Sequence, residues 1–307
     1  MSVRYDRPVS VSARLAGQFG VFSITMLVVV FLWHRFGPLT DPDFVGLILV
    51  AAIPAAFAVP LAIIGLCQLW YSGAYGGLKA ARGLILGLFP LALVGFAAYR
   101  YIVLPPIYDV STDLVEPPRW IVTPDAAQKW LPDRPEITPQ MREAQLIAYP
   151  ALNGRRYEGA LDRVYEAVLK VAQQNGFKVM ESLGEEYAAP ELTPEQEKDL
   201  EASVEAPGGA VAPDVGPVPS PRPEPAPPGV EPPLNPPGIV RLQVDTRSLF
   251  FGFPFDAVIR LREEAETTLV DIRVASRYGP HDLGFSAEIA QRFLHALDAE
   301  LLGIAGG

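Results

Sequence analysis

The chain has 307 residues, of which half are hydrophobic, and it carries 25 basic and 35 acidic residues for a net charge of −10. We do not expect the protein to bind nucleic acid, because contacts with phosphates need a positively charged surface. The single cysteine, Cys67, excludes an internal disulfide and a thiolate metal site. His295 has no second histidine or carboxylate cluster at ligand spacing, so we expect no metal and no cofactor.

Three long apolar segments occupy the first third of the chain: Val11 to Trp33, Phe44 to Trp70 and Leu84 to Leu104. Each is long enough to cross a bilayer, since about 20 helical residues span a ~30 Å hydrocarbon core. None has a charged residue in its middle, where transporters and proton relays usually need one. The pattern predicts that residues 1–104 are a three-helix transmembrane anchor.

The basic residues predict the orientation of this anchor. The loop between the first two spans contains only Arg35, whereas five basic residues flank the other side: Arg4, Arg7, Arg14, Lys79 and Arg82. Because short cytoplasmic loops are rich in Lys and Arg, the N-terminus is expected in the cytoplasm. Three crossings would then place everything after about residue 105 in the periplasm of a bacterial inner-membrane protein.

Two segments beyond the anchor lack the periodicity of folded elements. Residues 105–140 contain two Pro-Pro pairs and are interpreted as an extended membrane-proximal segment. Residues 184–237 hold 2 basic and 11 acidic residues and are rich in proline. This composition cannot bury enough apolar surface to fold, so it predicts a disordered insertion. A recognition sequence for a proline-binding partner, or an envelope-spanning spacer, is the alternative.

The remaining residues, 141–183 and 238–307, have the periodicity of an α+β domain. An amphipathic helix is predicted from Tyr157 to Asn175, between a short strand at Gln145–Tyr149 and a strand at Phe177–Leu183. Three runs with a strict period of two follow at 240–246, 255–261 and 270–276, and a closing helix has Ser286 as its expected N-cap.

The resulting order is β-α-β-β-β-β-α. One antiparallel sheet with two helices on its apolar face is the expected arrangement, because each strand has one polar side and each helix one apolar stripe. The proline-rich segment would be an insertion between two neighbouring strands, which is acceptable because loop closure costs little extra with length.

Several motifs in this domain resemble the bacterial domain-of-unknown-function 1499 family (DUF1499). They are Asp109-Val110-Ser111-Thr112-Asp113, Pro117-Pro118, Thr246-Arg247-Ser248-Leu249-Phe250-Phe251-Gly252-Phe253, Val274-Ala275-Ser276-Arg277-Tyr278-Gly279 and Asp282-Leu283-Gly284. The resemblance covers roughly residues 107–307 apart from the insertion. It implies membrane helices ahead of the domain, as argued above, and no established activity. Leu283 and Ser286 stand where the family commonly has an aromatic residue and an Asn.

Six arginines on the expected polar face of the last three strands form the candidate binding surface. They are Arg241, Arg247, Arg260, Arg262, Arg273 and Arg277. One interpretation is cross-strand ion pairing with aspartates on a solvated sheet. The other is an anion-binding face for lipid headgroups or an acidic partner, because the guanidinium fork fits phosphate and carboxylate.

Two further features could carry function. The aromatic turn from Phe250 to Phe255 either packs against the core or forms a tip that enters the membrane or grips a ligand. Ser276, His281 and Asp282 lie close together after a strand and form an alternative polar cluster. No G-x-S-x-G motif accompanies them, and His281 is interpreted as a local hydrogen-bonding residue of its turn.

Two classes of function remain open. The first is a non-catalytic envelope protein whose exported domain binds a lipid, an anionic polymer or an envelope protein through the arginine face or between helix and sheet. The second is a membrane-anchored enzyme with a polar cluster near Arg277, His281 and Asp282.

Overall fold

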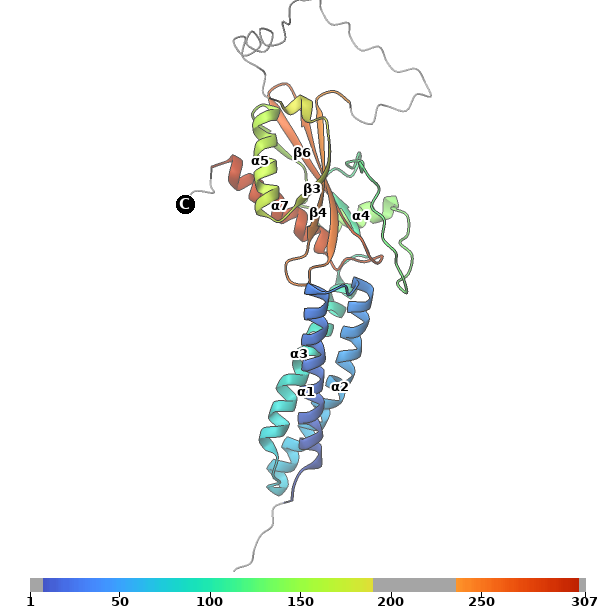
Figure 1. Ribbon diagram of the computed structural model, residues 1–307, viewed down its shortest axis with the longest axis vertical. Helices are drawn as coiled ribbons and strands as arrows, with labels where there is room; N and C mark the ends of the chain where they lie inside the picture. The colour runs from blue at the N-terminus through green and yellow to red at the C-terminus, as the bar shows by residue number, and fades with distance from the viewer. Residues whose placement is uncertain (1–7, 190–235, 304–307) are drawn as a thin grey trace, which may run out of the picture.

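The computed structural model describes residues 8–189 and 236–303. Three long helices form a bundle, and a mixed domain sits on one end of it (Figure 1). Most of the predicted disordered insertion, 190–235, lies outside the described residues.

The bundle confirms the three predicted apolar helices, α1 (Val11–Phe36), α2 (Asp41–Ser72) and α3 (Gly77–Val103). All three are long and apolar enough to span a membrane. The helix α1 begins at the end of the bundle far from the domain, and α3 leads into the domain (Figure 1). The domain therefore lies at the opposite end of the bundle from the start of α3, where Lys79 and Arg82 are located.

Small residues bring α1 and α3 into close contact. A Cβ atom on Gly20 would lie 2.8 Å from the carbonyl oxygen of Gly83, and one on Gly83 would overlap the backbone of Ala16. Such close backbone approach is typical of membrane helix interfaces, where packing replaces the hydrophobic effect as the main force.

The domain contains one antiparallel sheet, which confirms the predicted α+β class. Its strands are β1 (Asp109–Ser111), β2 (Arg155–Glu158), β3 (Lys178–Leu183), β4 (Ile239–Arg247), β5 (Pro254–Glu263) and β6 (Thr267–Ser276). The order is β1-β6-β5-β4-β3, and β2 also pairs with β6. Because β3 and β4 are neighbours, the insertion does connect adjacent strands, as expected.

Two helices, α5 (Leu161–Gln174) and α7 (Phe285–Leu301), cover one face of the sheet (Figure 1). Their apolar stripes meet the inward side chains of the strands, so that Val168, Leu242, Ile259, Phe293 and Leu297 are all fully buried. A short 3-10 helix, η1 (Glu185–Ala188), follows β3 and precedes the insertion.

Three sequence predictions about this domain are wrong in detail. Residues 145–149, expected to form a strand, instead form the end of helix α4 (Pro139–Ala148) and its C-cap, Tyr149. The strand before α5 is β2. Consequently α5 begins at Leu161 rather than Tyr157. The residue that flanks α7 at its start is Gly284, so Ser286 lies inside the helix.

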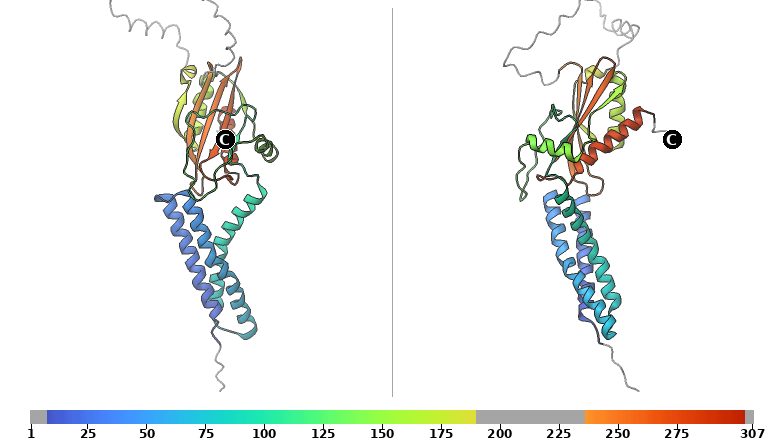
Figure 2. Two further views of the ribbon diagram at one scale, coloured as in Figure 1. Left: turned by 90° about the vertical axis from the view of Figure 1, so that its right-hand side faces the viewer. Right: turned by 180° about the vertical axis from the view of Figure 1, so that it is seen from behind.

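The segment 105–140 is not merely a lead from the membrane. It contributes β1 at the sheet edge, and residues 112–135, which we term the strap, cross the face of the sheet opposite α5 and α7 (Figure 2). The Gln243 side chain on β4 holds the strap by accepting from the amides of Ile121 and Val122 and donating to the Val122 carbonyl at 2.7 Å. The polar face of the sheet is thereby covered.

Candidate functional site

The predicted arginine face forms a buried polar layer between the sheet and the strap. Arg260, only 5% exposed, donates to Asp271 at 2.6 Å, to Asp113 at 2.8 Å and to the Glu116 carbonyl at 3.0 Å. Asp271 also accepts from Thr112. The strap therefore supplies acceptors that offset the cost of removing the guanidinium charge from water.

Two more of the six arginines are ion-paired in the same layer. Arg273 binds the Asp109 carboxylate with two nitrogens, at 3.0 and 2.8 Å, and its guanidinium lies 4.9 Å from the ring centre of Trp120 in the strap. Arg277 binds Asp256 and Asp245. The Asp256 hydrogen bond outweighs burial and raises the pKa of Arg277.

The other three arginines differ from one another. Arg241 is 3% exposed, and within the described residues it donates a single long bond, 3.4 Å, to the Arg119 carbonyl. Burial, with smaller contributions from Arg119 and Arg260, lowers its pKa. Arg262 lies 3.9 Å from Asp271, and Arg247 is exposed. The expectation of a solvated polar face is wrong, because β-strand periodicity does not reveal that a distant loop covers that face.

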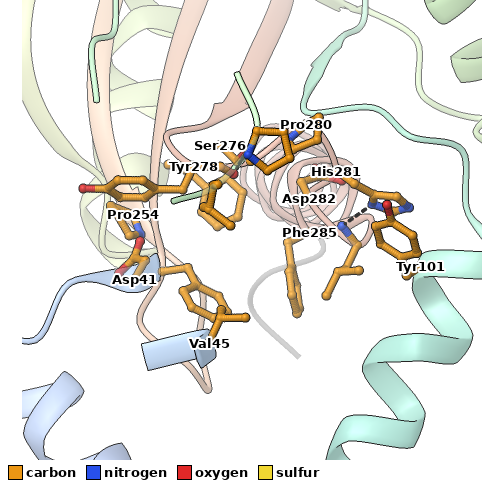
Figure 3. Close-up of a pocket in the computed structure, with 16 residues that line it drawn as sticks. Asp41, Val45, Tyr101, Pro254, Ser276, Tyr278, Pro280, His281, Asp282 and Phe285 are labelled. Carbon is orange, nitrogen blue, oxygen red and sulfur yellow. Dashed lines mark hydrogen bonds between the residues drawn. The ribbon is translucent and has the colours of Figure 1, made fainter. Parts of the chain in front are cut away.

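The alternative polar cluster lines a pocket at the base of the domain. Ser276, His281 and Asp282 all line this cavity of ≈ 360 Å³, together with Asp41 from α2 and Tyr101 from α3 (Figure 3). We term it the polar pocket. Arg277, the third residue of the enzyme hypothesis, is not among the lining residues.

Each of the three side chains serves the local backbone. His281 Nδ1 accepts from the Leu283 amide at 2.9 Å, so its proton is on Nε2, which faces the Leu104 carbonyl at 3.2 Å. Ser276 donates to the Tyr278 carbonyl. Among the hydrogen bonds of the described residues, none joins Ser276, His281 and Asp282 to one another.

Asp282 is the buried member of the cluster. It accepts from the amides of Gly284 and Ser286, both at 2.8 Å, and so satisfies free N–H groups at the start of α7. Burial raises its pKa above the ordinary carboxyl value, and these hydrogen bonds oppose the shift. This geometry is that of a helix cap.

Below the polar pocket, an apolar groove separates the upper parts of α2 and α3. It has a volume of ≈ 470 Å³ and is lined on α2 by Phe44, Val45, Ile48 and Leu49, and on α3 by residues including Leu93, Phe96 and Tyr101. Arg100 is the one charged side chain among its lining residues. The volume lies in the usual range for small-molecule sites.

Aromatic side chains of the domain form the roof of this groove. Phe253 stacks on Phe251 and contacts Phe44 of α2 with ring centres 5.7 Å apart. Phe285, the first residue of α7, completes the roof and lies under the Arg100 guanidinium at 4.9 Å. The aromatic turn thus packs on the end of the bundle, while Phe250 at its tip is 79% exposed.

The groove and the polar pocket are neighbours, because five side chains line both: Val45, Tyr101, Phe253, Leu283 and Phe285. The ring of Tyr101 stacks on His281 with centres 4.8 Å apart. The aromatic turn and the polar cluster were recognisable in the sequence, but the lining residues of α2 and α3 were not. The contacts between the turn and these helices depend on tertiary structure.

Comparison with known protein families finds a match within the domain. Residues 234–297 match the family model described as a protein of unknown function, DUF1499. No curated protein and no solved structure matches the chain.

Proposed function

We propose that the protein binds a membrane lipid where the bundle meets the domain. The chain belongs to the DUF1499 family through residues 234–297, and that family has no assigned function. The proposal therefore comes from the geometry of the site. An acyl chain occupies the groove between α2 and α3, and the polar part of the lipid reaches the polar pocket above it. The main observation behind the proposal is that an apolar groove lies directly next to a polar pocket.

The depth of the groove supports a lipid as the occupant. On α3, 17 uncharged residues from Gly83 to Tyr99 separate Arg82 from Arg100. At 1.5 Å per residue they cover about 26 Å, close to the thickness of a hydrocarbon core. Leu93 and Phe96 therefore lie within the apolar layer, and Arg100 lies at its boundary.

Charge also limits the class of ligand. Arg100 is already paired with Glu288, and Asp41 in the polar pocket is hydrogen-bonded to His34 at 2.8 Å. The Asp282 carboxylate in the pocket already accepts from the amides of Gly284 and Ser286, and the hydroxyls of Ser276 and Tyr278 are neutral hydrogen-bonding groups. This lining suits a neutral or zwitterionic polar head better than an anionic polymer. In this proposal the buried arginines hold the strap and do not touch the ligand.

The same proposal places the protein in a bacterial inner membrane, with the N-terminus in the cytoplasm and the domain in the periplasm. The excess of basic residues at the end of the bundle away from the domain supports this orientation. The lipid would then be taken from the periplasmic leaflet.

Photo-crosslinking tests the proposal. The full chain is reconstituted with a phosphatidylcholine that carries a diazirine in one acyl chain, and labelled peptides are identified by mass spectrometry. We expect labels concentrated at residues 44–49 and 93–102. Leu93→Trp fills the groove and should reduce this labelling about tenfold, since each excluded methylene removes about 0.8 kcal/mol.

Leu88→Trp is the matched control. Leu88 is also on α3 and is 54% exposed, but it is outside the lining of the groove. Its substitution should leave the labelling pattern unchanged. Labels spread evenly over all lipid-facing positions, or equal effects of the two tryptophans, would contradict the proposal.

A further inference from the structure

A second groove lies at the other end of the bundle, far from the domain. It is a cavity of ≈ 650 Å³ between α1 and α3, lined by Arg14, Gly17, Gln18, Val21, Phe22, Thr25, Lys79 and Arg82. It differs in chemistry from the first groove, because three of its eight lining residues are cationic. We term it the basic groove.

Helix geometry gathers these cations. Lys79 and Arg82 are three residues apart and so share one face of α3. That face meets α1 closely, since a Cβ on Gly17 would lie 3.1 Å from the Lys79 carbonyl oxygen. Arg14 lies one turn before Gln18 on the same stripe of α1. Three positive charges therefore surround one concavity.

These charges lack a protein counter-ion in the described part of the chain. Within residues 8–189 and 236–303, no acidic side chain pairs with Arg14, Lys79 or Arg82, whereas the buried arginines of the domain are paired with aspartates. A cluster of unpaired cations creates a positive potential that an anion would relieve.

The groove lies at the level of the lipid headgroups. Arg82 marks the end of the uncharged run of α3, and Val21 and Phe22 continue the groove along α1 toward the middle of the bilayer. Basic pockets between membrane helices with this arrangement are suited to anionic lipids, whose phosphate pairs with the cations and whose chains follow the apolar wall.

We propose that the basic groove binds the phosphate of an anionic phospholipid in the leaflet opposite the domain. Arg14, Lys79 and Arg82 contact the headgroup, and Val21 and Phe22 contact the first acyl carbons. This site is independent of the lipid proposed at the domain, since the two grooves share no residue.

Native mass spectrometry of the full chain in detergent tests this site, with phosphatidylglycerol and phosphatidylcholine of identical acyl chains as probes. We expect phosphatidylglycerol to bind about tenfold more tightly, because three basic residues attract its net negative charge. The double variant Lys79→Gln and Arg82→Gln retains only Arg14 and should lower the ratio of the two affinities to about two.

Two controls separate a built site from general surface charge. Arg163→Gln with Lys178→Gln removes the same charge from the exposed surface of the domain and should keep the preference. Thr25→Trp fills the groove but retains all three cations, and it should lower the preference. Equal binding of both lipids by the unmodified chain, or full preference in the Thr25 variant, would overturn the proposal.

Discussion

Arg260 illustrates how single residues join the strap to the sheet. Its side chain is 6% exposed, and its partner Asp271 is 4% exposed. Asp113 in the strap provides the second carboxylate. Burying such a pair gives little net stability, but removing one partner leaves an uncompensated buried charge. Loss of the strap contact would therefore leave the buried guanidinium of Arg260 with one carboxylate fewer.

Replacing Asp271 should destabilise the domain strongly. Asp271→Asn leaves Arg260 with one carboxylate, and we expect a loss of about 3 kcal/mol in the free energy of unfolding. For a domain of this size, that corresponds to roughly 6–12 °C in the melting temperature. Thermal unfolding of the purified full chain, followed by circular dichroism, measures it.

The control is an exposed pair of the same chemistry. Arg156 is 61% exposed and pairs with Glu264. Glu264→Gln should cost less than about 1 kcal/mol, because solvent screens surface pairs. If Asp271→Asn shifts the melting temperature no more than Glu264→Gln, the polar layer does not contribute to stability as described.

The six arginines were recognisable from the sequence as one face of the sheet, and Arg260, Arg273 and Arg277 do pair with aspartates. Their burial was not predictable. The alternation of apolar and polar residues indicates which side of a strand is polar, but it is the same for a solvated face and for one covered by a loop. The Gln243 contacts with the strap join residues about 120 positions apart.

At the scale of elements, the long periodic patterns predicted structure well. The three alternating runs became β4, β5 and β6, and the amphipathic patterns became α5 and α7. Short elements were missed. The apolar stretch at 145–149 is compatible with strand or helix, and β1 has only three residues. The Thr138-Pro139 start signal could have identified α4, because Thr138 caps it by accepting from the Met141 amide.

The contact of α1 with α3 leads to a prediction about the bundle. A side chain on Gly83 would collide with the backbone of Ala16, which cannot move without separating the helices. Gly83→Leu should therefore lower the melting temperature of the detergent-purified chain, since overpacking typically costs about 1–3 kcal/mol. Fluorescence-detected size exclusion after heating provides the measurement.

Gly95 is the matched control on the same helix, because nothing lies within 4 Å of a Cβ atom built there. Gly95→Leu should remain close to the unmodified chain. Similar melting temperatures for the two leucine variants would refute the importance of the α1–α3 contact.

At the scale of the whole molecule, the bundle and the domain meet through side chains rather than through a flexible linker. Phe253 touches both His34 and Phe44, and Lys129 in the strap pairs with Asp43 at the start of α2. Arg100 near the end of α3 pairs with Glu288 on α7. These contacts hold the polar pocket directly above the groove between α2 and α3.

The sequence predicted the two parts but not their contact. Composition separates an apolar anchor from a polar domain. The periodicity of helices (3.6 residues) and of strands (two residues) does not indicate which surface of the bundle contacts which surface of the domain. The groove arises only from that contact, because its walls come from α2 and α3 and its roof from the aromatic turn and α7.

The most direct test of lipid binding at this junction is a cryo-electron microscopy map of the full chain in nanodiscs of phosphatidylcholine. We predict elongated density between α2 and α3, beneath Phe251, Phe253 and Phe285, with its polar end entering the pocket beside His281. A map in which α2 and α3 close against each other, or in which the groove contains no density, would contradict the account.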